Sequence, residues 1–359
     1  MRIELPISKS IANRLLILQA IHGDGLMTVS CDMPDDVRIM SEAIRLLGER
    51  REARIDLGNC GTAMRFLTAY CAQLDGKMVI LEGVERMHHR PIGQLVDALR
   101  VIGADIEYLG EEGFPPLRIK GCILDKHRIV TINNPQSTQF VSALLLIGAN
   151  VQTDSTSPYI TLTRELIQHY TTLHNSTQRY TIEKDWSSAA FWYEYVALHG
   201  GEITLLGLSR DSLQGDKVVA DIFVHLGVHT EYTEEGITIT KNEDEEFLIQ
   251  QYEQQKSTTQ TTKSNNTLNI DFSACPDLYP AVAITCERLG VEIHATGVES
   301  LPLKESDRLR AVREHRTDAD HRMAMALLIA GYEVDDTACI SKSYPQFIEQ
   351  WKSVNTSNE

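Results

Sequence analysis

One pattern recurs along this chain: an amphipathic helix, a glycine at its end, and a short strand after the glycine. The helices predicted to end at Gly103 and Gly227 show it clearly, and those ending at Gly48 and Gly290 follow it. A glycine just past the last helical turn is the usual left-handed helix stop. Alternation of helices with strands predicts an α/β or mixed layered fold, and the repetition predicts an assembly of similar modules.

Length and composition narrow the class of protein. At 359 residues the chain exceeds one typical hydrophobic core, so we expect two domains. No apolar run is long enough to span a bilayer and no signal-peptide pattern opens the chain, so a cytoplasmic protein is expected. The formal charge of −16 disfavours a broad nucleic-acid-binding surface. None of the seven cysteines has CxxC spacing, which disfavours a disulfide scaffold or a zinc cluster.

The stretch from Leu5 to Arg14 predicts a strand that leads into a helix. Apolar residues alternate at its start and recur at helical spacing after it. Ser10 is a suitable N-cap, which places Lys9 at the junction and Arg14 on the same side of the helix as Ser10. Free N–H groups at a helix start, together with a lysine, a hydroxyl and an arginine, form an anion site. A capped helix with two solvated cations would show the same local pattern.

Cationic residues recur at or near predicted helix starts. The helix dipole favours cations at the opposite end, so their repeated placement predicts multiply charged anionic ligands. Walker and dinucleotide glycine motifs are absent, so scattered side chains and helix ends should hold the phosphates. The cations are Lys9, Arg14, Arg65, Arg90, Lys304, Arg308, Arg322 and Lys342.

Two helix starts carry polar groups of other kinds. Ser137, Thr138 and Gln139 put two hydroxyls and an amide at one start, which fits either simple capping or a phosphate or polyol site. Asp277, at another start, would stay ionised. That suits a base or a hydroxyl anchor, and equally a carboxylate that only stabilises its helix.

Lys304 and Arg308 are four residues apart and are expected on one side of a helix. Like charges there repel, so an anion between them is one interpretation. Neutralisation by Glu305 and Asp307 in a surface network is the other.

Other segments are predicted to be structural. A strand is expected from Tyr159 to Leu162, and an exposed excursion without a functional role from Glu243 to Thr267. The tail after Trp351 is expected to fray. The adjacent His88-His89 pair should point in two directions, which argues against metal ligation there.

Taken together, the motifs resemble those of the EPSP synthase (3-phosphoshikimate 1-carboxyvinyltransferase) family. They occur in the same order as in the family and span most of the chain. The motifs are LPISKSIANR (5–14), DDVR (35–38), GNCGTAMRF (58–66), ERMHHRPIGQLVDALR (85–100), STQF (137–140), SPYI (157–160), LQGD (213–216), CPD (275–277), KESDR (304–308), DHRMAMA (320–326) and SKSYP (341–345).

The resemblance implies a mixed α/β fold of two domains, the inside-out α/β barrel, each built from three βαββαβ-type modules. The N-terminal domain, on the shikimate 3-phosphate side, would span 8–184. The C-terminal domain would comprise 1–7 and 185–359, with the active site in the cleft between the two.

The implied reaction moves the carboxyvinyl (enolpyruvyl) group of phosphoenolpyruvate to the 5-hydroxyl of shikimate 3-phosphate by addition and elimination of phosphate. By resemblance, Asp277 deprotonates the hydroxyl, and Glu305, assisted by Lys9, protonates the methylene. No cofactor or metal is expected, and the enzyme should be a monomer. The residues implied to bind phosphoenolpyruvate are Lys9, Asn59, Gly61, Arg90, Gln139, Arg308, Arg322 and Lys342. Those implied to bind shikimate 3-phosphate are Lys9, Ser10, Arg14, Ser137, Thr138, Gln139, Tyr159, Asp277 and Lys304.

The chain also departs from the family pattern. It is shorter at 48–55, 174–180 and 313–320, where strands or helices are expected to be missing. Five residues replace more usual ones: Cys60, Phe66, Thr138, Thr156 and Ser300.

Two alternative functions stay open at this point. One is a related carboxyvinyl transferase acting on a UDP-amino sugar, although His88 and His89 stand where those enzymes carry a loop cysteine. The other, motivated by the shortened segments, is a catalytically silent relative that binds anions and serves as a scaffold.

Overall fold

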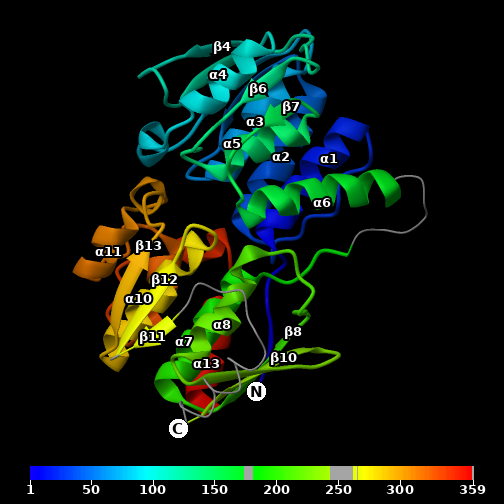
Figure 1. Ribbon diagram of the computed structural model, residues 1–359. Coiled ribbons are helices and arrows are strands. Elements are labelled where there is room, and N and C mark those ends of the chain that lie inside the picture. Colours follow the sequence, from blue (N-terminus) through cyan, green and yellow to red (C-terminus); the bar gives the residue numbers. More distant parts are fainter. Residues whose placement is uncertain (174–180, 243–261, 265, 358–359) are drawn as a thin grey trace. The chain divides into compact units, whose positions relative to one another are not determined.

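The structure is a computed structural model, and it describes residues 1–173, 181–242, 262–264 and 266–357. The chain divides into two compact units (Figure 1). We call Lys9–Ile182 the inserted unit. The split unit consists of Met1–Ser8 together with Glu183–Glu359, so the chain leaves it after eight residues and returns later. Among the described residues, no helix combines the length and the apolar character needed to cross a membrane.

The inserted unit contains one complete module with a four-stranded sheet. The sheet order is β2-β3-β5-β4, in which β2 and β3 are parallel and β5 is antiparallel to both of its neighbours. Two helices connect the strands, and the short 3-10 helix η1 precedes the second. The elements are β2 (Glu52–Asp56), α3 (Gly61–Ala72), β3 (Met78–Glu82), η1 (Glu85–His89), α4 (Gly93–Val101), β4 (Asp105–Tyr108) and β5 (Leu117–Lys120).

The split unit repeats this topology strand for strand. Its sheet order is β1-β8-β10-β9, again with one parallel pair followed by antiparallel pairing on both sides of β10. The repeat confirms the prediction of similar modules. The elements are β1 (Arg2–Glu4), α7 (Trp186–His199), β8 (Glu202–Leu206), η2 (Gly215–Val218), α8 (Val219–Val224), β9 (Val228–Tyr232) and β10 (Gly236–Lys241).

Each unit also contains a shortened module, in which the parallel strand pair is present but the described residues hold no closing hairpin. In the inserted unit these are β6 (Ile129–Thr131), α5 (Thr138–Leu146), β7 (Asn150–Gln152) and α6 (Pro158–Leu173). In the split unit they are β12 (Thr267–Asp271), η3 (Pro276–Leu278), α10 (Tyr279–Leu289), β13 (Glu292–Thr296), η4 (Leu301–Leu303) and α11 (Arg308–Glu314), with β11 (Thr262–Ser264) antiparallel to β12.

The remaining helices of the two units lie outside these modules. They are α1 (Lys9–His22) and α2 (Asp35–Glu49) in the inserted unit, and α12 (His321–Ile329), η5 (Ala338–Lys342) and α13 (Phe347–Ser357) in the split unit.

Two of the three predicted shortenings lie within the described residues. Helix α2 ends at Glu49 and β2 begins at Glu52, so only Arg50 and Arg51 separate them. Helix α12 follows α11 after a six-residue link, His315–Asp320, where a complete module has two strands. The third shortening, at 174–180, lies outside the described residues.

Four structural predictions need correction. Helix α2 was expected to end at Gly48, but it continues to Glu49 and its C-cap is Arg50. The segment from Tyr159 to Leu162 is the start of helix α6, because Ser157 accepts the first amides and the apolar residues that follow pack on α1. The tail after Trp351 does not fray at once, since α13 continues to Ser357 and buries Val354. The predicted excursion from Glu243 lies largely outside the described residues, but its last part forms β11 and the start of β12.

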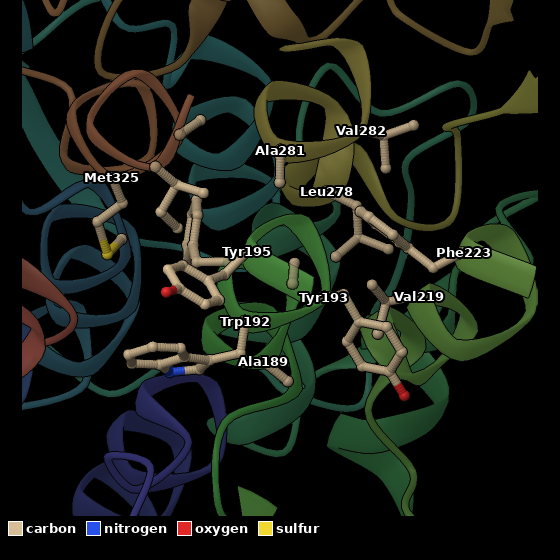
Figure 2. Packing of buried hydrophobic residues seen from close by; sticks show 14 of the residues in the cluster. Ala189, Trp192, Tyr193, Tyr195, Val219, Phe223, Leu278, Ala281, Val282 and Met325 are labelled. Carbon is tan, nitrogen blue, oxygen red and sulfur yellow. The ribbon is translucent and has the colours of Figure 1, made fainter. Parts of the chain in front are cut away.

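Helix α7 lies at the centre of the split unit's core. It is buried on all sides, and its aromatic side chains pack against α8 and α10 (Figure 2). Trp192 donates a hydrogen bond to the Tyr344 hydroxyl at 3.0 Å, which joins α7 to the segment before α13. Helix α7 also packs against α10 and α12. The charged residues Asp277 and Arg322 lie in the turn before α10 and at the start of α12.

Candidate functional site

In the split unit, three cations converge on the carboxylate of Asp277. One oxygen, Oδ1, accepts hydrogen bonds from Lys304 Nζ at 3.2 Å and from Arg308 Nη1 at 2.7 Å. The other, Oδ2, accepts one from Arg322 Nη2 at 3.0 Å. The carboxylate that Lys304 and Arg308 share is therefore a side chain of this protein, Asp277, and not Asp307 as one of the two interpretations had it.

Arg308 links that carboxylate to two more. Its Nε donates to Asp320 Oδ2 at 2.8 Å, and its Nη2 donates to Glu305 Oε2 at 3.1 Å. Lys342 Nζ lies 3.5 Å from the other oxygen of Glu305. Four cations and three carboxylates thus form one connected network within the split unit.

Helix ends bring this network together. Asp277 lies in the 3-10 turn η3 before α10, while Arg308 and Arg322 are the first and second residues of α11 and α12. Asp320 caps α12 by accepting from the backbone N–H of Arg322 at 2.9 Å. Lys304 was expected on the same helix side as Arg308, but it lies before α11 begins, and the shared carboxylate brings the two together instead.

Burial shapes the ionisation of these groups. Arg308 and Arg322 expose 1% and 2% of their surfaces. Burial lowers the pKa of Lys304, although Asp277 opposes the shift. For Arg322 burial also acts downward, but the charges of Asp277, Asp185 and Asp216 together outweigh it, and the pKa lies above its usual value. Burial, followed by the charge of Asp277, raises the pKa of the neighbouring Asp216 to about 6.

In the inserted unit, two arginines lie against the start of α3. Arg90 Nη1 donates to the backbone carbonyl of Asn59 at 3.1 Å, and Arg65 Nη1 donates to Gln139 Oε1 at 3.1 Å. A Cβ atom at Gly61 would lie 2.6 Å from Arg90 and 2.4 Å from Arg65. The absence of a side chain at Gly61 therefore lets both guanidinium groups approach the helix start.

The cap of α3 and the position of Arg90 both follow from local sequence. Cys60 is buried and its Sγ accepts from the Ala63 amide at 3.4 Å, so this thiol is the N-cap. Arg90 ends the 3-10 turn η1, and α4 starts at Gly93, three residues after it.

Arg14 is surrounded by neutral oxygens. Its guanidinium donates to Thr163 Oγ1 at 2.7 Å, to the Ser10 carbonyl at 2.7 Å and to Ser142 Oγ at 3.2 Å. It also lies 5.2 Å from the ring centroid of Phe66. Burial lowers the pKa of Arg14 to about 10. Within the described residues, no carboxylate forms an ion pair with this buried cation.

The remaining predicted residues lie at helix starts of the inserted unit. Lys9 begins α1, so Ser10 is inside the helix and not its cap, and Lys9 Nζ lies 3.1 Å from Asp36. Ser137 caps α5 by accepting from the Gln139 amide at 3.4 Å, and Thr138 is the first helical residue.

Tyr159 lies in the first turn of α6, where its carbonyl accepts from Arg14 Nη2 at 3.4 Å. The group that Tyr159 presents to Arg14 is thus a backbone oxygen at a helix start, where a strand was predicted.

The predicted residues thus fall into separate groups. The split unit brings Asp277, Lys304, Glu305, Arg308, Arg322 and Lys342 together. The inserted unit gathers Asn59, Gly61, Arg90 and Gln139 around the start of α3. A second group there joins Arg14, Ser10 and Tyr159.

Sequence reasoning missed five residues of these networks. Asp36, Asp216 and Asp320 lie in the motifs DDVR, LQGD and DHRMAMA, so a search for carboxylates beside the predicted cations could have found them. Ser142 and Thr163 are helical residues without a distinguishing sequence signal, and only the packing of α5 against α6 brings them to Arg14.

Metal ligation has no support in the described part of the chain, where no group of three or more His, Cys, Asp or Glu residues is arranged to hold an ion. The adjacent histidines His88 and His89 both approach Glu85, at 3.6 and 3.4 Å.

Comparison with known proteins agrees with these observations. Two α/β units with the same module in each define a fold that solved structures also have. The chain matches the sequence profile of the EPSP synthase (3-phosphoshikimate 1-carboxyvinyltransferase) family over residues 1–316 and 313–351, and it belongs to that family. The two matched segments meet where α11 leads into the six-residue link.

Individual relatives cover nearly the whole chain. The 3-phosphoshikimate 1-carboxyvinyltransferase of Bacteroides fragilis strain YCH46 is 36% identical over 406 residues, covering 96% of this chain and 93% of its own. That of Escherichia coli strain SMS-3-5 is 31% identical over 410 residues, with 97% and 95% coverage. An EPSP synthase structure from Acinetobacter baumannii matches with a TM-score of 0.65 at 18% identity, covering 98% and 95% of the two chains. These matches confirm the predicted family and fold.

Proposed function

We propose that this protein transfers the carboxyvinyl group of phosphoenolpyruvate to the 5-hydroxyl of shikimate 3-phosphate and releases phosphate. Family membership and relatives that carry the name of this activity support the proposal. The observation that carries it is the Asp277 carboxylate in contact with Lys304, Arg308 and Arg322. A base among cations suits a reaction in which a hydroxyl loses its proton beside two bound phosphates.

Asp277 would accept the proton of the 5-hydroxyl as that oxygen attacks the enol carbon of phosphoenolpyruvate. The three cations hold Asp277 as a carboxylate, which is the form that a base requires. They also neutralise part of the negative charge that two anionic substrates bring to one site. In the second step, the methyl group would lose a proton to a base of the site and phosphate would leave. These losses restore the carbon–carbon double bond, now in the enol ether of the product.

Glu305 would donate the proton that converts the methylene to a methyl group, assisted by Lys9. Arg308 and Lys342 flank Glu305 at 3.1 and 3.5 Å, and nearby cations favour the charged form of a carboxyl group. A substrate phosphate would compete with Glu305 for both cations, and the carboxyl group would then hold a proton more readily. Substrate binding would in this way prepare Glu305 to act as an acid.

The two ligands divide among the residues in the following way. Phosphoenolpyruvate would contact Lys9, Asn59, Gly61, Arg90, Gln139, Arg308, Arg322 and Lys342. Shikimate 3-phosphate would contact Lys9, Ser10, Arg14, Ser137, Thr138, Gln139, Tyr159, Asp277 and Lys304. The contacts of Arg14 with neutral oxygens support its place in the second set, because they leave its charge available to an anion.

We further propose that the active site lies in a cleft between two domains, 8–184 and 1–7 plus 185–359. The compact units of the chain have boundaries within two residues of these. The absence of cofactor, the cytoplasmic location and the monomeric state stay predictions. The comparisons do not favour the UDP-amino-sugar and scaffold alternatives.

The test is phosphate release from phosphoenolpyruvate with shikimate 3-phosphate, for the unaltered protein and for Glu305→Gln. We expect the unaltered protein to turn over. In Glu305→Gln kcat should fall roughly a hundredfold or more, because an acid–base group typically contributes that much to the rate. Glu314→Gln, on the exposed side of α11, is the matched control and should keep full activity. Equal rates for Glu305→Gln and the control would remove the acid–base role. Turnover only with a UDP-amino sugar would replace the proposed substrate.

A further inference from the structure

The six-residue link His315–Asp320 joins two helices whose first turns carry Arg308 and Arg322. A complete module of this chain places a strand hairpin at this point, as β4–β5 and β9–β10 show. Without a hairpin, something else must fix α11, a helix of only seven residues with Arg308 at one end and His315 at the other. A helix this short is stable only through its tertiary contacts.

A group of three side chains, which we call the clasp, holds the far end of α11. The ring of His315 stacks on that of Tyr332 with centroids 4.2 Å apart and planes at 23°. His315 Nε2 lies 2.7 Å from Glu287 Oε1 on α10, and the Tyr332 hydroxyl donates to that same oxygen at 2.7 Å. The clasp therefore joins the end of α11 to α10 and to the turn after α12.

Ionisation of Glu287 agrees with this arrangement. Partial burial disfavours its charged form, but the hydrogen bonds from His315 and Tyr332 outweigh burial and hold its pKa below the usual value. The carboxylate thus accepts hydrogen bonds from His315, the first residue of the link, and from Tyr332, which follows α12.

The backbone of the link is tightly specified as well. His315, Asp318 and Ala319 have positive φ angles of 50°, 47° and 56°. The Arg316 amide bonds to the carbonyl of Ala311 at 3.0 Å and so closes the helix end. Thr317, which is 2% exposed, donates to Asp335. A link with three left-handed residues has little freedom to adjust if one of its anchors is lost.

We propose that His315 is a positioning residue that sets the placement of Arg308 relative to Arg322 through the clasp. The proposal rests on the function proposed above, in which both arginines bind phosphoenolpyruvate. Arg308 and Arg322 meet on Asp277, and Asp320 contacts both the Arg308 side chain and the Arg322 backbone. A shift of α11 would move one guanidinium group relative to the other and weaken the binding of phosphoenolpyruvate, which needs both.

The test compares two substitutions at His315 with one at Tyr332. His315→Asn tolerates the left-handed backbone but loses the ring stack. His315→Gln keeps a donor for Glu287, and Tyr332→Phe keeps the stack but loses the hydroxyl. We expect KM for phosphoenolpyruvate to rise about tenfold in His315→Asn and less in the other two, while KM for shikimate 3-phosphate stays within twofold.

The control is Arg310→Ala, which removes an exposed ion pair with Glu314 from the same helix and leaves the clasp intact. Its KM values should equal those of the unaltered protein. Thermal unfolding of all variants separates a lost fold from a displaced arginine, since a purely structural role would lower Tm without a selective change in KM.

Three outcomes overturn the inference: an unchanged KM for phosphoenolpyruvate in His315→Asn, an equal rise in both KM values, or the same rise in Arg310→Ala. Absence of turnover by the unaltered protein would instead overturn the proposed function. The two failures are therefore distinguishable.

Discussion

Asp277 accepts hydrogen bonds from three cationic side chains, two of them almost fully buried. Replacing it with asparagine removes the charge that holds them together and leaves like charges facing one another. Breaking a buried ion pair on one side is costly because the remaining charge loses its partner.

We therefore predict that Asp277→Asn loses both activity and stability. The expected fall in kcat/KM is roughly a hundredfold or more, and the free energy of unfolding should drop by about 3 kcal/mol. Phosphate-release kinetics and urea unfolding measure the two effects. Asp211→Asn, at an exposed position outside the site, serves as the control. Full activity in Asp277→Asn would exclude the residue as the base.

Glu194 is an ionisable residue that is fully buried in the middle of α7. Neither of its carboxyl oxygens has a hydrogen-bond partner among the described residues. Burial raises its pKa well above the ordinary value of 4.5, so the folded protein keeps a proton that the unfolded chain releases. Stability that depends on this proton is complete at acid pH and is lost as pH rises above about 4.5.

We predict that Glu194→Gln makes stability less sensitive to pH. The difference in unfolding free energy between the variant and the unaltered protein should grow by up to about 1.4 kcal/mol per pH unit above pH 5, as one proton requires. Urea unfolding at several pH values measures it, with the exposed Glu333→Gln as the control. Parallel pH profiles for the unaltered protein and Glu194→Gln would contradict a buried neutral carboxyl group.

Among the elements, the start of α3 shows how a helix end can be shaped for a ligand. Gly61 admits two guanidinium groups against the backbone, and a methyl group would displace one or both. The displaced atoms are the ends of flexible side chains, so the fold should tolerate the change.

Gly61→Ala should accordingly weaken binding and leave the fold intact. We expect KM for phosphoenolpyruvate to rise roughly tenfold, because the loss of about one charged hydrogen bond weakens binding by that factor. Tm should stay nearly unchanged. Gly48→Ala is the comparison, because a Cβ there meets nothing within 4 Å. An equal KM in the two variants would show that Arg65 and Arg90 do not depend on Gly61.

Sequence patterns predicted several helix starts and ends because their signals are local. Gly290 ends α10 in the left-handed conformation, as its position after an apolar helix suggested. Ser137 caps α5, and Asp320 caps α12. The motifs also indicated the family and the shortened link.

The failures have tertiary causes. Ile160, Thr161 and Thr163 favour strands by propensity, yet packing on α1 makes the segment helical. No spacing rule could pair Arg14 with Ser142 and Thr163, which lie 128 and 149 residues away. The clasp is equally non-local, since it joins α10, the link and the turn after α12.

For the whole molecule, the proposed site depends on charge gathered from many segments of an acidic chain. Salt screens such attractions, most strongly where water reaches the charges. We predict that KM for both substrates rises roughly fivefold or more between low and high ionic strength. Steady-state kinetics in potassium chloride measure this, with unfolding free energy followed in parallel. Salt-independent KM values would contradict a cationic site.

The first strand of the split unit has an unusual position in the chain. The terminal amine of Met1 donates a hydrogen bond to the carbonyl of Glu202, 201 residues away, and among the described strands β1 pairs with β8 alone. A chain leaving the ribosome therefore exposes an edge-forming segment long before its partner is synthesised, while the whole inserted unit can already collapse. The split unit can fold only after the second half of the chain has been synthesised, although its first strand is made first.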